Sequence, residues 1–141
     1  EEDALIAIKP DSVGFVHELR LENLLWDGRR AEAGRMIPRV GKDLQALAKA
    51  RLGLQGEAKG VSALIDAVPK ARADDPGLAF DRFVWRMKRD AYDDALEMIL
   101  QRSTGAEALG RPEAWAERRA ILARWLMRQG RPGEAYKVAA S

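Results

Sequence analysis

Carboxylate side chains gather in one part of the sequence, between residues 74 and 97, and they are the first candidates for chemistry. The group comprises Asp74, Asp75, Asp81, Asp90, Asp93, Asp94 and Glu97. Two carboxylates can cleave a glycosidic bond when they flank it, one of them acting as an acid. Asp94 and Glu97 lie three residues apart on a helical pattern, on the face opposite Leu96. We expect that face to be the solvent side of an amphipathic helix and not a cleft, so we predict no catalytic residue.

Arg118 is a candidate binding residue because it interrupts an apolar stripe. Trp115 and Trp125 share one face of a predicted helix, and Arg118 falls between them on that face. A charge at such a position needs a partner. We expect an ion pair between helices, with Glu97 or Glu134 as the partner. The alternative is that Arg118 binds a carboxylate of a ligand or of another domain.

The four tryptophans are candidates for stacking on sugar rings. Trp26, Trp85, Trp115 and Trp125 stand at helical spacings, where tryptophan belongs more often to a core than to a binding surface. Trp26 lies beside a predicted turn and is the one that we expect to be exposed. Arg118 and Trp26 are therefore the two ligand contacts that the sequence suggests.

Other kinds of site are not indicated. His17 is the only histidine and there is no cysteine, so we predict no metal site. The glycine-rich stretch 53–60 has no Gly-Lys-Ser or Gly-Lys-Thr, so we predict no phosphate loop and no cofactor. The net charge is only +2 and basic residues alternate with acidic ones, which argues against a nucleic-acid partner.

The sequence also argues against a membrane span. No apolar run approaches the roughly 20 residues that a membrane-spanning helix needs. The opening run of three acidic residues, 1–3, differs from the basic start of a signal peptide. Because the chain opens and ends within a pattern, we expect it to be a piece of a longer protein.

The elements that must position these residues are predicted to be helices. The 141 residues are 47% hydrophobic and 33% charged, which suits a folded domain with a sizeable core. Apolar residues recur at spacings of three, four and seven, and no stretch alternates as a strand would. We expect helices over 12–27, 30–37, 43–52, 61–68, 76–89, 92–100, 112–129 and 132–140, a short apolar-acidic segment at 1–8, and an irregular connection at 103–111.

Several residues are predicted to begin or end these helices. Pro38 should stop the second helix, because proline disfavours helical structure in the residue before it. Asp43 should cap the third. Asp74 or Asp75, followed by Pro76, is the strongest signal for a helix start in the chain.

Three predicted turns share one sequence pattern. Gly28, Asp90 and Gly130 each follow an apolar helix end, and an alanine comes five residues after each of them. Those small residues, Ala33, Ala95 and Ala135, would let the second helix lie close to the first. Gln55-Gly56 is expected to be a fourth, degenerate copy. This repetition predicts an all-α fold, a right-handed superhelix of stacked helical hairpins like a tetratricopeptide solenoid, as one domain over residues 1–141.

Two stretches between residues 74 and 140 carry the clearest motifs. The first has Asp-Pro-Gly-Leu-Ala-Phe-Asp-Arg-Phe at 75–83, Trp-Arg-Met at 85–87 and Tyr-Asp-Asp-Ala at 92–95. The second has Gly-Arg-Pro-Glu-Ala-Trp at 110–115, Glu-Arg-Arg at 117–119, Leu-Ala-Arg at 122–124, then Gly130 and Ala-Tyr at 135–136. Together they resemble the N-terminal superhelical domain of the soluble lytic murein transglycosylases. Over 19–68 only the helix-turn-helix pattern agrees.

The resemblance implies a protein of the Gram-negative periplasm that acts on peptidoglycan. Such proteins cleave the β-1,4 bond between N-acetylmuramic acid and N-acetylglucosamine and leave a 1,6-anhydro end. A lysozyme-like C-terminal domain carries one catalytic glutamate, and the helical region forms a horseshoe or ring around it. The Glu-Ser pair that marks this glutamate is missing, since no glutamate here is followed by serine.

The resemblance therefore implies that this chain is a non-catalytic scaffold. It would pack on a catalytic domain outside the chain and guide glycan strands along an arginine-lined face, with Arg118 and Trp26 as glycan contacts. Two other functions stay open. A tetratricopeptide-like adaptor for a protein or peptide would show a groove with exposed aromatic residues and no affinity for glycan. An enzyme in its own right would need carboxylates that converge in a cleft.

Overall fold

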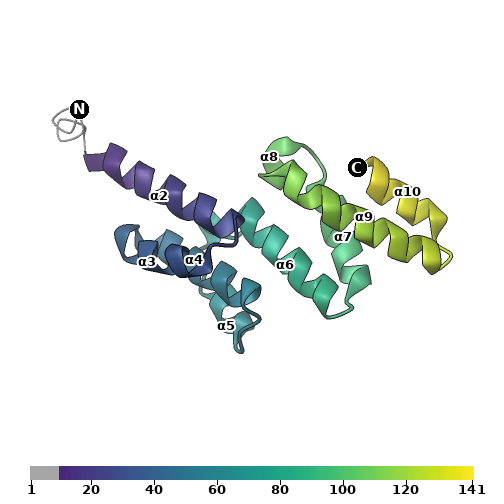
Figure 1. Cartoon of the computed structure of the whole chain (residues 1–141), viewed down its shortest axis with the longest axis horizontal. Helices are drawn as coiled ribbons and strands as arrows, with labels where there is room; N and C mark the ends of the chain where they lie inside the picture. The colour runs from purple at the N-terminus through teal and green to yellow at the C-terminus, as the bar shows by residue number, and fades with distance from the viewer. Residues whose placement is uncertain (1–9) are drawn as a thin grey trace. The chain divides into compact units, whose positions relative to one another are not determined.

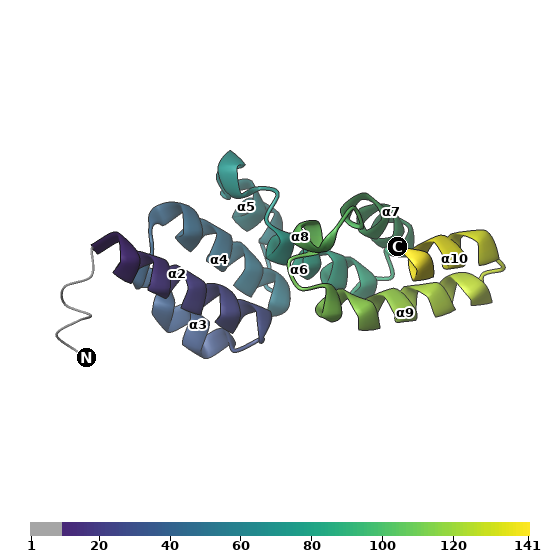
Figure 2. The ribbon, with the colours of Figure 1, turned by 90° about the horizontal axis from the view of Figure 1, so that it is seen from above.

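The computed structural model describes residues 10–141, and the regular elements in that range are all helical (Figures 1 and 2). They are α2 (Pro10–Trp26), α3 (Arg30–Met36), η1 (Ile37–Arg39), α4 (Lys42–Gln55), α5 (Val61–Asp66), η2 (Lys70–Arg72), α6 (Pro76–Lys88), α7 (Tyr92–Arg102), α8 (Ala106–Leu109), α9 (Pro112–Arg128) and α10 (Pro132–Ala140), where η marks a short 3-10 helix. The prediction of an all-α fold is thus confirmed for the described residues, and the predicted segment 1–8 lies outside them.

The chain divides into two compact units, the first ending at Ala73 and the second comprising Asp74–Ser141. Each unit contains helices that pair in chain order, so both are built from helical hairpins. The superhelical arrangement of these hairpins, and the single domain over residues 1–141, stay predictions.

In the first unit, α2, α3 and α4 pack on one another and α5 packs on α4. The core is made of leucines and alanines at helical spacings: Leu21, Leu25, Ala33, Leu44, Leu47 and Ala48. Gly53 lies inside α4, where an added β-carbon would come within 2.7 Å of the Leu64 side chain, so the glycine lets α5 approach without displacing that leucine. The helix continues to Gln55, three residues beyond the predicted end at residue 52.

In the second unit, α6 packs on α7 and α8, and α9 and α10 pack on each other and on α7. The core carries larger side chains than the first unit: Phe83, Ile99, Trp115, Leu122, Leu126 and Val138 are fully buried. Trp115 donates its indole N–H to the carbonyl oxygen of Leu109 at 2.8 Å. The bond anchors α8, a short helix within the stretch 103–111 that the sequence predicts to be irregular.

Asp75 begins its helix as predicted, Asp43 does not cap its helix, and Pro38 follows a helix that ends one residue before the predicted place. The Asp75 carboxylate accepts a hydrogen bond from the Leu78 N–H at 3.0 Å, with Pro76 at the first helical position, as predicted. By contrast, the N-cap of α4 is Gly41, and Asp43 lies in the first turn. The negative charge of Asp43 is still stabilised there by the positive end of the helix dipole. Pro38 lies inside η1, so the α-helix before it already ends at Met36.

The three aligned turns have the same hydrogen bonds. Gly28, Asp90 and Gly130 have φ angles of 73°, 58° and 71°. The N–H of each donates to the carbonyl oxygen three residues earlier, with N···O distances of 3.1–3.3 Å. The N–H of the following residue donates to the carbonyl oxygen five residues earlier, at 2.9 Å. This is the Schellman motif, in which a left-handed residue ends the helix and satisfies its last carbonyls. Ala33 and Ala95 are then 0% exposed and Ala135 is 4% exposed, so the predicted close approach at these alanines is confirmed.

The fourth copy exists, but its left-handed residue is Glu57 and not Gly56. Glu57 has a φ angle of 53°, and the Ala58 N–H bonds the Gly53 carbonyl at 2.9 Å, as in the other turns. The next helix begins four residues after Glu57, at Val61, instead of two residues after the left-handed residue as in the other copies. The longer connection explains why no alanine occupies the fifth position there.

Asp90 is the one aligned position where a residue with a β-carbon adopts the left-handed conformation. We expect Asp90→Gly to raise the free energy of unfolding by about 0.5–1 kcal/mol, because glycine adopts this conformation without steric cost. Gly130→Ala, at the equivalent turn, should lower it by about 1 kcal/mol. Urea unfolding followed by circular dichroism measures both, and destabilisation by Asp90→Gly would show that the aspartate side chain contributes more than its strain costs.

Among residues 10–141, no helix combines the length and the apolar character that a membrane crossing requires.

Candidate functional site

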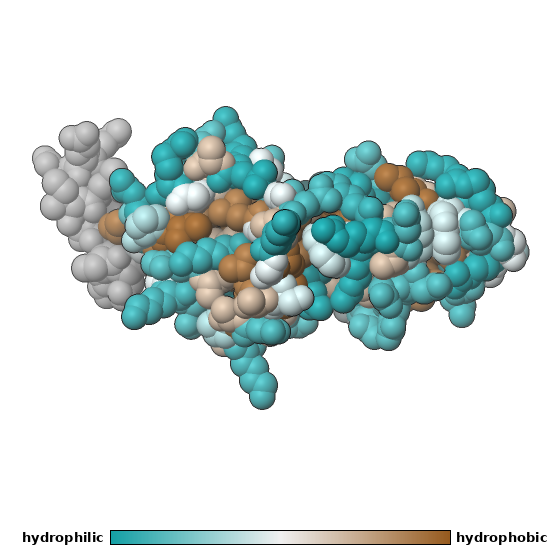
Figure 3. Space-filling model, turned by 90° about the horizontal axis from the view of Figure 1, so that it is seen from below, coloured by the Kyte–Doolittle hydropathy of each residue, from teal (hydrophilic) through white to brown (hydrophobic). Residues whose placement is uncertain are grey.

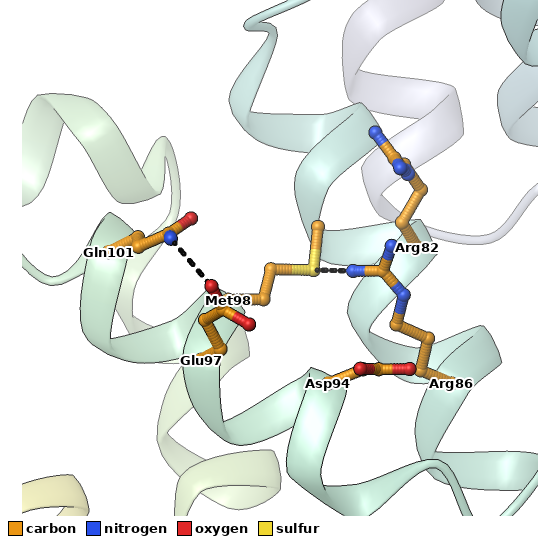
Figure 4. Close-up of a pocket in the computed structure, with 6 residues that line it drawn as sticks. All are labelled: Arg82, Arg86, Asp94, Glu97, Met98 and Gln101. Atoms are coloured by element: carbon orange, nitrogen blue, oxygen red, sulfur yellow. Dashed lines mark hydrogen bonds between the residues drawn. The ribbon is translucent and has the colours of Figure 1, made fainter.

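The main candidate site is a cavity of about 380 Å³ on the α6–α7 hairpin. Two arginines from α6 and four side chains from α7 line it: Arg82, Arg86, Asp94, Glu97, Met98 and Gln101. Figure 4 shows Arg86 directed toward Met98, while Glu97 and Gln101 lie on the other side of that methionine. Both signs of charge therefore meet around one small, polar hollow.

Helical periodicity places these side chains together. Arg82 and Arg86 are four residues apart on α6, so they lie one above the other on one face. Asp94 and Gln101 are seven residues apart on α7 and likewise share a face. The sequence places Asp94 and Glu97 on the solvent side of their helix, and both are exposed. The prediction that they avoid a cleft is wrong, because the neighbouring α6 supplies a second wall.

The charges in this cavity are not paired with one another. Arg86 directs its Nη1 to the Met98 sulfur at 3.1 Å, and Glu97 accepts a hydrogen bond from Gln101 at 3.3 Å. Among the described residues, Arg82 and Asp94 have no ion pair. Burial, together with the nearby charge of Arg86, lowers the pKa of Arg82. The two guanidinium groups thus have no carboxylate within salt-bridge distance, although Asp94 and Glu97 line the same cavity.

Arg118 does not make the predicted ion pair. Its side chain is half-buried, and within residues 10–141 it contacts no carboxylate closely enough for a salt bridge. Both predicted partners are engaged elsewhere, Glu97 with Gln101 and Glu134 with Arg131. The physical reason is proximity, since Arg131 precedes Glu134 by three residues on the same helical turn.

Arg131 forms the charge cluster that sequence reasoning missed. Its guanidinium bonds Glu134 at 2.6 and 2.7 Å and Asp93 at 2.7 Å, so it connects the starts of α7 and α10. The hydrogen bond from Arg131 lowers the pKa of Glu134, and the bonds that Arg131 donates to Glu134 and Asp93 raise the pKa of Arg131. The sequence did contain a signal for this cluster, namely an acidic residue in the first turn of each helix, Asp93 in α7 and Glu134 in α10. The cluster stabilises helix starts and needs no ligand.

Trp26 is less exposed than predicted. It is half-buried, and the guanidinium of the buried Arg51 lies over its ring, 5.0 Å from the centroid. Trp85 has Arg89 over its ring at 3.8 Å, and Trp125 stacks on Tyr92 at 4.4 Å. Each of these tryptophans therefore has one face covered by another side chain, which favours packing over sugar binding.

A second candidate surface lies between α9 and α10. It is an apolar groove of about 580 Å³, lined by Ala123, Arg124, Met127, Arg128, Pro132, Ala135, Tyr136 and Ala139. Tyr136 is 74% exposed, whereas Val138 of the same helix is buried. Met127 is 59% exposed. This hairpin therefore presents an apolar face that its own unit does not cover.

The first unit also exposes apolar side chains. Val13, Phe15, Val16 and Leu19 of α2 are 43–63% exposed. Val16 also lines a groove of about 500 Å³ on α2, α3 and η1, together with charged residues that include Arg20, Glu32 and Arg35. Figure 3 shows hydrophobic surface, in brown, between hydrophilic side chains, in teal. These exposed faces suit contacts with other protein surfaces.

Metal binding has no support in the part of the chain that the structure describes, since no three His, Cys, Asp or Glu side chains gather there as a metal site requires. Comparison of the chain with protein-family models, with curated proteins and with solved structures found no match. The function is therefore argued from the motifs and from the geometry of these surfaces.

Proposed function

We propose that this chain is a non-catalytic helical scaffold region of a periplasmic lytic transglycosylase. The enzyme would cleave the bond between N-acetylmuramic acid and N-acetylglucosamine with a 1,6-anhydro product, and this region would shape the access of glycan strands to a catalytic domain elsewhere. The observation that carries the proposal is the pair of motif stretches between residues 74 and 140.

The structure gives most of these motif residues a packing or turn role, which suits a scaffold. Asp75 caps α6, Trp115 fills the core of the second unit, and Ala95 allows α7 to approach its neighbours. Gly130 ends α9 in the left-handed conformation. Residues with these roles determine how the helices pair, and they do not take part in a reaction.

Two surfaces support contacts that the proposal needs. The apolar groove of α9 and α10 offers a face for packing on the catalytic domain. The arginines of the α6–α7 cavity offer positive charge for the carboxylates of peptidoglycan. Arg118, which is half-buried without an ion pair among the described residues, is a third cation that a carboxylate could reach.

Co-sedimentation of the chain with purified peptidoglycan sacculi tests the proposal, with mass spectrometry of the supernatant. We expect the chain to sediment and to release no anhydro-muropeptides. The double variant Arg82→Gln/Arg86→Gln should sediment less, while Lys88→Gln, which removes an exposed cation of α6 outside the cavity, should sediment like the wild type.

Absence of sedimentation would contradict glycan guidance. Released anhydro-sugars would contradict the non-catalytic assignment. The variants Arg118→Gln and Trp26→Leu test the two residues that the sequence suggests as glycan contacts, and sedimentation unchanged by both would remove them from the site.

A second candidate function is a tetratricopeptide-like adaptor for a protein or peptide. One observation favours it: the α9–α10 groove is apolar and carries an exposed aromatic residue, Tyr136. An adaptor should not sediment with sacculi. If sedimentation fails, the adaptor becomes the better explanation, and Tyr136→Ala is then the variant that should weaken binding of a protein partner.

A further inference from the structure

We propose that the α6–α7 cavity binds a zwitterionic amino-acid group, with Arg82 and Arg86 contacting its carboxylate and Asp94 and Glu97 contacting its ammonium. The inference deepens the proposed function and rests on it for the natural source of the ligand, an amino-acid centre of a peptide stem of peptidoglycan whose amine is not part of an amide bond. The class of ligand follows from the cavity alone.

The two arginines of the cavity lie close enough for their charges to repel each other. Like charges four residues apart on a helix destabilise it slightly, and here no carboxylate within salt-bridge distance relieves the repulsion between Arg82 and Arg86. A bound carboxylate would lie between two guanidinium groups that each donate several hydrogen bonds. Such an anion would remove the repulsion.

The carboxylates of α7 restrict the charge of the ligand. Asp94 and Glu97 line the same cavity, and neither forms an ion pair with the arginines of α6. A ligand that carried only negative charge would be repelled by them. A ligand with an ammonium next to its carboxylate satisfies both sets of charges.

Uncharged hydrogen-bond partners hold the opposite charges of the cavity apart. Arg86 donates to the Met98 sulfur, a weak acceptor, and Glu97 accepts from the neutral Gln101. Figure 4 shows Met98 between Arg86 and Glu97, so the thioether separates the two charges. Replacing these weak, neutral partners by charged ligand atoms makes stronger hydrogen bonds on both sides.

The test uses the full 141-residue chain, labelled with nitrogen-15, and alanine as the probe. Amide signals of α6 and α7 should shift on titration with free alanine. N-acetylalanine, which keeps only the carboxylate, and alaninamide, which keeps only the ammonium, should each bind roughly ten-fold more weakly, because each loses one charged contact. Equal binding of N-acetylalanine and alanine would show a simple anion site and overturn the proposal.

Two variants assign the ends of the ligand. In Glu97→Gln, alanine should lose much of its advantage over N-acetylalanine, because a partner of the ammonium is gone. In Arg86→Gln, alanine should likewise lose much of its advantage over alaninamide. Lys88→Gln is the matched control and should bind alanine as the wild type does, since Lys88 does not line the cavity. Alanine binding that is insensitive to both cavity variants would also overturn the assignment.

The outcomes separate this inference from the proposed function. Sedimentation with sacculi, combined with no shift on titration with alanine, would leave the scaffold proposal standing and overturn the amino-acid site. Shifts with alanine but no sedimentation would keep the ligand class and overturn the scaffold proposal. No response in either experiment overturns both.

Discussion

Replacing Trp115 by alanine is expected to lower the free energy of unfolding by about 3–5 kcal/mol, the usual cost of removing a large aromatic side chain from a core. Trp115 is 0% exposed and lies 5.3 Å, centroid to centroid, from both Phe80 and Phe83. Its indole also holds the Leu109 carbonyl at 2.8 Å. Deletion would therefore leave a cavity and remove one of the two hydrogen bonds that the Leu109 carbonyl accepts, the other coming from the Arg111 N–H at 2.8 Å.

Two variants separate these contributions. Trp115→Phe keeps most of the apolar contact and loses the hydrogen bond, so it should cost clearly less than Trp115→Ala. Ala116→Leu, next to it on the exposed side of α9, should change stability by less than about 0.5 kcal/mol. Urea unfolding followed by circular dichroism gives all three values. A Trp115→Ala variant as stable as the wild type would show that the core of the second unit is not built around this residue.

Enlarging Ala95 to leucine is the second change with a large expected effect, a loss of about 1–3 kcal/mol. Ala95 is 0% exposed and lies in the first turn of α7, where the chain has just reversed at Asp90. A leucine there would force α7 away from its neighbours, because a packed interior has no free volume to receive three more carbons.

The same substitution can be compared across the hairpins. Ala33→Leu, at the equivalent place after Gly28, should be destabilising for the same reason, since Ala33 is also 0% exposed. Thermal unfolding by calorimetry would measure both variants and show whether the two units melt separately. If either leucine were tolerated without loss of stability, the small residue after the turn would not be what sets the distance between paired helices.

The charge clusters show the limit of reasoning from helical periodicity. Periodicity correctly places Asp94 and Glu97 on the exposed face of α7, yet it does not reveal that Arg82 and Arg86 of α6 form the opposite wall. It also suggests Glu134 as a partner for Arg118, while the structure gives Glu134 to Arg131. In both cases the partner of a charged side chain depends on which helices are neighbours and on the rotamers that long side chains adopt.

The sequence by itself determined the features that depend on neighbours within about five residues. The helix start at Asp75-Pro76 and the turns at Gly28, Asp90 and Gly130 are such features, because caps and Schellman motifs are closed by local hydrogen bonds. Only the tertiary structure decided which charges meet, and which apolar residues stay exposed, such as Tyr136. These properties arise from contacts between helices that are distant in the chain, where packing, and not periodicity, selects the partner.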